Sequence, residues 1–274
     1  MKSLLEGCSY RVKVHSVFDH AINFIAKENW LITILPKGFS EGPQTIILGN
    51  KDFQDLKSLM TIDSIWDFHR LINIKDARII RGKIVNRLSL NDMTKLEVNI
   101  IYFQRLLDKK GNKAGLLGKD NVYSDYASTW LELFSIHFQK HEFEEAGVRL
   151  SHLIGLGPGL TPSGDDFILG IFTSIYFLGL NKKGRTKLVE TAIKDAVNRT
   201  NLISYNMLRQ GALGGFISWV ENMINVLIYG DIEQINRSFY NMEKIGSSSG
   251  SDISAGILYG AKEILKLYKR TELS

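Results

Sequence analysis

Acidic and hydroxyl side chains lie within a glycine-rich stretch, residues 155–166 (GLGPGLTPSGDD), that leads directly into an apolar segment at 167–180. The stretch holds four glycines, two prolines, two hydroxyls and two carboxylates, a composition that no hydrophobic core requires. The apolar segment predicts a buried helix, and the N-terminus of a helix leaves backbone N–H groups free to bind an anion. The stretch therefore predicts half of a ligand site.

A second stretch repeats the end of the first. Residues 163–171 align without gaps to residues 249–257, and both follow the pattern S-G-x-D-x-x-x-G-I. The offset of 86 residues is long for a stacked repeat, so we expect two similar corners within one helical domain. Gly170 and Gly256 occupy equivalent positions inside the predicted helices, where a glycine costs about 1 kcal/mol relative to alanine. We therefore expect these glycines at a close contact between helices.

Both corners also fit a purely structural interpretation, because S-x-x-D before an apolar run is a capping box and a first-turn aspartate favours the helix dipole. Capping does not explain the glycines at every second position, Gly155, Gly157 and Gly159. They leave the backbone without side chains there, so that another group can approach it closely. Nucleotide loops do not fit either. Asp165-Asp166 stand where a P-loop requires Lys-Ser/Thr, and the third glycine and the preceding strand of a dinucleotide-binding turn are missing. Amides and carboxylates together suit a ligand with an anionic end and an amide end.

The candidate site takes its residues from both corners and from the segment between them. We expect the carboxylates Asp165, Asp166 and Asp252 to be catalytic, accepting from an NH₂ group of the ligand. Alternatively they hold a divalent cation, the one cofactor that the sequence suggests. Asn206 and Arg209 share one face of a predicted helix and could reach a carboxylate, although a solvated face is the alternative. The expected substrate-binding residues are Gly157, Gly159, Thr161, Ser163, Gly164, Asn206, Arg209, Ser249 and Gly250.

Composition excludes several classes of protein. The chain has 274 residues, of which 44% are hydrophobic and 23% charged, as in ordinary soluble domains. Its net charge of +5 favours anionic ligands, but the basic residues are scattered, so we expect no nucleic-acid partner. The single cysteine, Cys8, excludes a disulfide framework. Residues 167–180 are shorter than the ~20 of a membrane span, and the start lacks a signal peptide, so we expect a cytoplasmic protein without a membrane partner.

Two sequence patterns divide the chain, and they predict an α+β fold. Residues 1–110 are expected to form a β-rich domain, a small antiparallel or barrel-like sheet, and residues 116–274 an all-α domain that carries both corners. The loop at 36–43 is typical of a hairpin between its flanking strands. The predicted strands are 11–18, 31–35, 45–48, 77–85 and 95–103, with helices at 19–26 and 53–60 between them. The later helices are expected at 123–139, 142–154, 165–180, 186–198, 203–213, 216–228, 232–244 and 252–268.

Residues 156–166 and 248–252 (SSGSD), with an early Ser-Val-Phe strand at 16–18, resemble the signature of the AllH-like family, long catalogued as a domain of unknown function. The resemblance spans most of the chain. It implies a subunit of oxamate carbamoyltransferase from anaerobic allantoin degradation, a part of purine catabolism. This transferase interconverts oxalurate plus phosphate with oxamate plus carbamoyl phosphate. Its other subunits would be separate chains, one of them similar to acyl-CoA synthetases.

The resemblance assigns no catalytic residue, so the roles come from the motif. Carbamoyl transfer passes through an oxyanion and a departing phosphate, and we expect backbone amides around Ser163-Gly164 and Ser249-Gly250 to hold one of them. Two alternatives stay open. The chain is a non-catalytic subunit that binds a small anion or serves assembly, or it is a hydrolase that depends on a hard metal ion.

Overall fold

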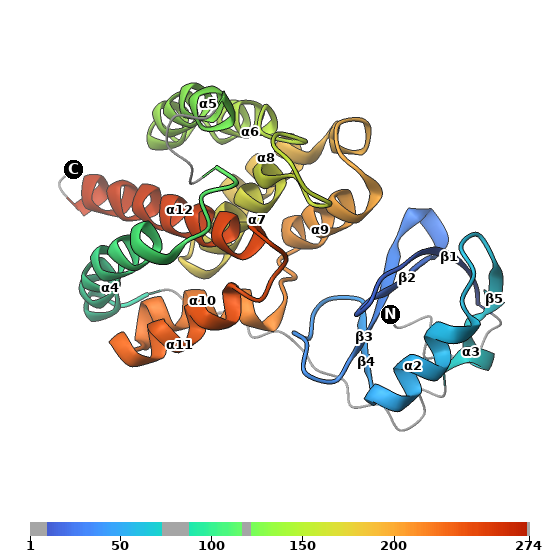
Figure 1. Cartoon of the computed structure of the whole chain (residues 1–274). Coiled ribbons are helices and arrows are strands. Elements are labelled where there is room, and N and C mark those ends of the chain that lie inside the picture. The colour runs from blue at the N-terminus through green and yellow to red at the C-terminus, as the bar shows by residue number, and fades with distance from the viewer. Residues whose placement is uncertain (1–9, 73–87, 117–121, 273–274) are drawn as a thin grey trace. The chain divides into compact units, whose positions relative to one another are not determined.

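The computed structural model describes residues 10–72, 88–116 and 122–272. The chain divides into two compact units, Met1–Gly82 and Lys83–Ser274, whose helices and strands are coloured blue to cyan and green to red in Figure 1. The first is built on a sheet and the second is helical, so the α+β class is confirmed. The predicted division at 110–116 is based on the polar, glycine-containing residues 108–115.

A five-stranded sheet with the order β4-β3-β2-β1-β5 forms the first unit. Alternate residues of the strands, among them Val12, Val14 and Ile34, are buried against Phe53 and Phe68 of the flanking helices. The strands are β1 (Arg11–Val17), β2 (Ile22–Ile25), β3 (Leu31–Pro36), β4 (Thr45–Leu48) and β5 (Ile65–Asp67), and the helical elements are η1 (Lys27–Asn29), α2 (Asn50–Leu59) and α3 (Phe68–Leu71).

Two predictions about this sheet are wrong. The expected helix at 19–26 is instead β2, which pairs antiparallel with both β1 and β3. Its polar residue Asn23 is buried because it donates to Ser16 and accepts from Thr33, and this polar interruption hid the strand pattern. The expected hairpin is also wrong, because β3 and β4 are parallel and make the sheet mixed. The predicted strand at 77–85 lies outside the described residues.

Helices make up the second unit. The predicted strand at 95–103 is wrong, because it lies inside α4. That helix begins with a capping box between Ser89 and Asp92, and its buried side chains recur every three or four residues. The helical elements are α4 (Leu90–Lys110), α5 (Val122–Gln139), α6 (Phe143–Ser151), α7 (Ser163–Phe177), α8 (Lys182–Ile193), η2 (Ala196–Asn198), α9 (Leu202–Ala212), α10 (Ser218–Tyr229), α11 (Ile232–Met242) and α12 (Ser249–Glu272).

The centre of the second unit is the crossing of α7 and α12, which lie side by side in Figure 1. Every residue of α7 except Tyr176 is buried. A Cβ atom on Gly170 would lie 2.1 Å from the carbonyl oxygen of Ile253, and one on Gly256 would lie 2.0 Å from that of Phe167. The close helix contact expected at these two glycines is therefore confirmed.

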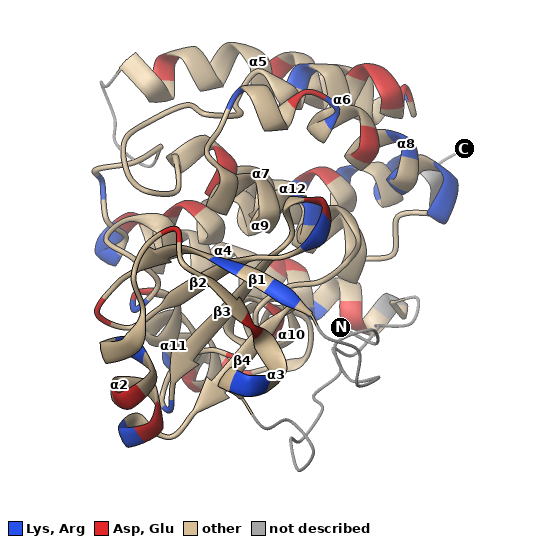
Figure 2. Ribbon diagram, turned by 90° about the vertical axis from the view of Figure 1, so that its right-hand side faces the viewer, with Lys and Arg blue, Asp and Glu red and all other residues tan. Residues whose placement is uncertain are grey.

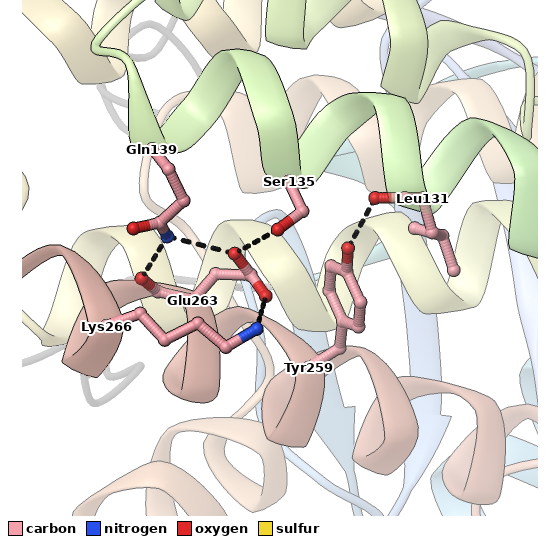
Figure 3. Close-up of polar contacts among 6 residues, drawn as sticks. All are labelled: Leu131, Ser135, Gln139, Tyr259, Glu263 and Lys266. Atoms are coloured by element: carbon pink, nitrogen blue, oxygen red, sulfur yellow. Dashed lines mark hydrogen bonds and ion pairs between the residues drawn. The ribbon is translucent and has the colours of Figure 1, made fainter.

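Polar side chains connect α12 to α5 through a buried glutamate, Glu263, which is 2% exposed. Its carboxylate accepts from Ser135 at 2.7 Å and from Gln139 at 2.9 Å, and it pairs with Lys266 at 2.6 Å (Figure 3). In the same view the hydroxyl of Tyr259 donates to the carbonyl oxygen of Leu131 at 2.6 Å. These contacts fix the orientation of α12 against α5.

Charged residues are distributed along the ribbons of many elements rather than gathered on a single one (Figure 2). Among the described helices, none combines the length and the apolar character needed to cross a bilayer.

Candidate functional site at two helix corners

The first corner is the glycine-rich loop in front of α7. Gly155, Gly157 and Gly159 have φ values of 78°, 97° and 109°, which L-residues with side chains rarely adopt. A Cβ atom on Gly155 would also lie 2.1 Å from the carbonyl oxygen of Arg199. The alternating glycines are thus required by the fold of the loop itself.

The second corner, in front of α12, repeats the backbone geometry of the first. The amide of Gly164 donates to the carbonyl of Leu156 at 2.8 Å, and the amide of Gly250 donates to that of Ile245 at 3.0 Å. The amides of residues 165 and 166 donate to the carbonyl of residue 162, as those of 251 and 252 do to that of 248. Six positions separate Gly157 from Ser163 and three separate Gly246 from Ser249, so the first loop is three residues longer.

These hydrogen bonds affect two predictions from the sequence: the capping box at Ser163 and the binding of an anion by backbone amides. The N-cap of α7 is Pro162, which makes no side-chain cap bond, so Ser163 does not form the capping box that the pattern favours. The amides of Gly164 and Gly250 already donate to carbonyls of the chain. An anion held by these two amides would have to displace those bonds.

The two corners meet at Thr161. Its hydroxyl donates to Asp166 Oδ2 at 3.0 Å and lies 2.9 Å from the hydroxyl of Ser249. Burial raises the pKa of Asp166 to about 8, and the negative charges of Asp252 and Asp165 add to this rise. Asp166 is therefore protonated at neutral pH, and the aspartates of both corners are close enough to influence one another.

The other two aspartates are bonded to neighbouring loops. Asp165 accepts from the amide of Gly155 at 2.8 Å and from the hydroxyl of Thr200. Asp252 accepts from the amide of Leu116 at 2.8 Å. Burial raises the pKa of both carboxyls, and the hydrogen bonds they accept oppose that rise. Each aspartate thus holds a segment of backbone against its corner.

Three polar atoms at the corners are buried and make no hydrogen bond of good geometry, although the Ser163 hydroxyl is close enough to the carboxyl of Asp252 to lower its pKa. They are Ser163 Oγ, Asp166 Oδ1 and Asp252 Oδ2, and their residues are 1%, 1% and 0% exposed. Because the great majority of buried polar atoms have a partner, this group of three is the candidate contact for a polar ligand.

Two family models match the chain. The N-terminal domain of the AllH family matches residues 1–81, and the oxamate carbamoyltransferase subunit AllH matches residues 153–261. This chain belongs to the AllH family. The second match begins in front of the glycine loop and ends within α12, so both corners of the AllH chain lie inside it. No solved structure matches the chain.

Asn206 and Arg209 of this AllH chain each make a contact within α9. The side chain of Asn206 donates to the carbonyl of Leu202 at 2.9 Å, and the guanidinium of Arg209 lies 5.3 Å from the ring centre of Tyr205. These two contacts do not support the expected role of the two residues in substrate binding, which stays a prediction.

Two residues of the segment between the corners hold the first loop of the AllH chain in place. Thr200 donates to Asp165, and the side-chain amide of Asn201 donates to the carbonyl of Leu160 at 2.6 Å. Asn201 also caps α9 by accepting from the amides of residues 203 and 204. An asparagine directly before a helical pattern is a cap signal, so the sequence could have indicated Asn201.

Among the residues that the structure describes, no group of three or more histidine, cysteine, aspartate or glutamate side chains is arranged to hold a metal ion. Asp165 and Asp252 of the AllH chain instead accept hydrogen bonds from backbone amides.

Proposed function

We propose that this chain is the subunit of an oxamate carbamoyltransferase in which the two corners bind the carbamoyl group of the substrate. The observation that carries the proposal is the group of buried, unpartnered oxygens formed by Ser163, Asp166 and Asp252. Membership of the AllH family supports the enzyme, because the family model is described as a subunit of it.

The protonation of the two aspartates fits a carbamoyl group. Asp166 Oδ2 accepts from Thr161, so a proton on this carboxyl lies on Oδ1, the unpartnered atom. A protonated Asp166 Oδ1 donates to the carbamoyl oxygen, and Asp252 Oδ2 accepts from the carbamoyl NH₂. A carbamoyl group needs both, since it offers one acceptor oxygen and two N–H donors.

The same arrangement serves the reaction. An oxygen of hydrogen phosphate bonds to the carbamoyl carbon of oxalurate, the bond from that carbon to the amide nitrogen breaks, and the proton of hydrogen phosphate goes to that nitrogen. Carbamoyl phosphate and oxamate result. Negative charge develops on the carbamoyl oxygen in the transition state, where a donor positioned in advance lowers the barrier. Asp166 is that donor.

An assembly subunit without catalytic groups is the second candidate. It is favoured by the bonds that Asp165 and Asp252 make to loops of the chain itself, because such bonds also serve a structural purpose. This candidate predicts that Asp166 can be replaced without loss of turnover.

The test is phosphate-dependent cleavage of oxalurate by the full chain, alone and assembled with the other subunits. We expect Asp166→Ala, which removes the donor, and Asp252→Asn to lower kcat by about 100-fold or more, as removal of an oxyanion donor does. Asp63→Asn is the matched control, since Asp63 is exposed and pairs with Lys13 in the first unit. Wild-type turnover by a correctly folded Asp166→Ala enzyme would disprove the catalytic role.

A further inference from the structure

Three basic side chains lie beside the first corner. Arg149 is in the last turn of α6, His152 follows that helix as its C-cap, and Arg199 follows η2. The imidazole of His152 stacks flat on the ring of Trp130, with 3.5 Å between ring centres and an angle of 3° between the planes. The aromatic contact gives the imidazole a fixed position.

The position of Arg199 is fixed by the residues around it. Its carbonyl oxygen packs directly against Gly155, and the next two residues, Thr200 and Asn201, bond to Asp165 and Leu160. The backbone of Arg199 is therefore attached to the glycine loop, its side chain is exposed, and its charge acts on the buried Asp165.

The two arginines carry positive charge that the chain only partly balances, and the imidazole of His152 lies beside them. Burial lowers the pKa of His152, and the charges of Arg199 and Arg149 lower it further, so the three groups are close to one another. Arg149 meets Glu145 only at 3.6 Å, and its Nε is buried without a partner. Close basic groups of this kind attract an anion.

We propose that Arg149, His152 and Arg199 bind the anionic group of a small substrate, a carboxylate or a phosphate. The inference rests on the proposed function and extends it: the corners bind the carbamoyl or amide end of the substrate, and the basic group binds its charged end. The amides of Gly164 and Gly250 are already bonded within the chain and are not free to hold an anion. The basic group supplies an anion site in their place.

The test follows the imidazole of His152 by NMR in the full chain, with its signal identified by its loss in His152→Gln. The ligands are oxamate, inorganic phosphate and oxamide, which replaces the carboxylate of oxamate by a neutral amide. A bound anion favours the imidazolium, so oxamate, phosphate or both will raise the pKa of His152, whereas oxamide will not. The ligand that moves the signal identifies the anion.

Affinity measured by calorimetry gives an independent readout. Arg199→Gln is expected to weaken binding of that anion about 10- to 100-fold, as loss of a charge-assisted hydrogen bond does. Arg237→Gln is the matched control, because Arg237 is an exposed arginine of the same unit that pairs with Glu233, and it is expected to bind as the wild type does.

Three results would overturn the inference: neither anion binds, an anion binds without moving the signal of His152, or Arg199→Gln binds as tightly as Arg237→Gln. The last two are expected if the basic residues serve only to complement the C-terminus of α6. The proposed function fails separately. If Asp166→Ala retains turnover while oxamate still shifts the signal of His152, the carbamoyl role is wrong and the anion site stands.

Discussion

The hydroxyl of Thr161 lies 2.9 Å from the hydroxyl of Ser249, although the two residues are 88 positions apart in the sequence. The same Thr161 hydroxyl donates to Asp166. One side chain of the longer loop thus connects the two corners and contacts the carboxyl to which we assign the central role.

Replacing Thr161 by valine will loosen this connection. Valine keeps the shape of threonine but removes the hydroxyl, which leaves Asp166 Oδ2 and Ser249 Oγ without their shared partner. We expect Thr161→Val to lower the free energy of unfolding by about 1–3 kcal/mol, the cost of unsatisfied buried polar groups. Urea unfolding followed by the helical circular dichroism signal measures the change.

Thr161→Ser is the control for that substitution, because serine keeps the hydroxyl and loses only a methyl group. Its free energy of unfolding is expected to lie closer to that of the wild type. Equal stability of Thr161→Val and the wild type would show that the hydroxyl contacts are not needed to join the corners.

Stability will depend on pH through Asp166. The pKa of Asp166 is about 8 in the folded chain and about 4 in an unfolded one, so the folded state binds the extra proton between these values. The free energy of unfolding therefore falls as pH rises from about 4 to about 8, by about 1.4 kcal/mol per pH unit at most, and this contribution levels off above about pH 8.

Asp166→Asn removes that dependence, because asparagine stays neutral and resembles the protonated carboxyl in shape. Urea unfolding of both proteins between pH 5 and pH 9 tests this. The difference in unfolding free energy is expected to change in favour of Asp166→Asn as pH rises, with Asp63→Asn parallel to the wild type. Parallel curves for Asp166→Asn and the wild type would mean that Asp166 is already ionised at low pH.

A methyl group at the α7–α12 crossing will force the helices apart. The Cβ atom of Gly170→Ala would overlap backbone atoms of α12, which cannot rotate away as a side chain can. We expect a loss of about 1–3 kcal/mol despite the better helix propensity of alanine. Thermal unfolding measures this change.

Gly211→Ala in α9 is the matched control, since the nearest atoms to its Cβ belong to side chains such as that of Leu169. Those side chains can move, so the cost at Gly211 is expected to be smaller. A Gly170→Ala protein as stable as Gly211→Ala would contradict the close backbone contact.

The buried Glu263 will be sensitive to loss of its charge. In Glu263→Gln an amide NH₂ replaces an oxygen that accepts from Ser135 and Gln139 or pairs with Lys266 (Figure 3). Two donors then face each other, and we expect a loss of about 1–3 kcal/mol. Glu233→Gln, at an exposed ion pair with Arg237, is expected to change stability by less than about 0.5 kcal/mol in the same urea experiment.

The sequence predicted most of the helical unit, because helices are formed by local contacts whose period is visible in the chain. The predicted helix 203–213 corresponds to α9, and 232–244 to α11. Strand predictions were less successful. In β2 the buried Asn23 interrupts the apolar run, and its hydrogen bonds depend on Ser16 and Thr33 of neighbouring strands.

What the sequence by itself determined about the site is that two S-G-x-D corners exist, and that glycines at equivalent positions of their helices mark a close contact. The contacts between the two corners and their electrostatic effects became visible only in the tertiary structure. The bond between Thr161 and Ser249, the raised pKa of Asp166 and the position of Arg199 beside Gly155 all join residues distant in sequence. Burial and charge act through space, and no spacing along the chain records them.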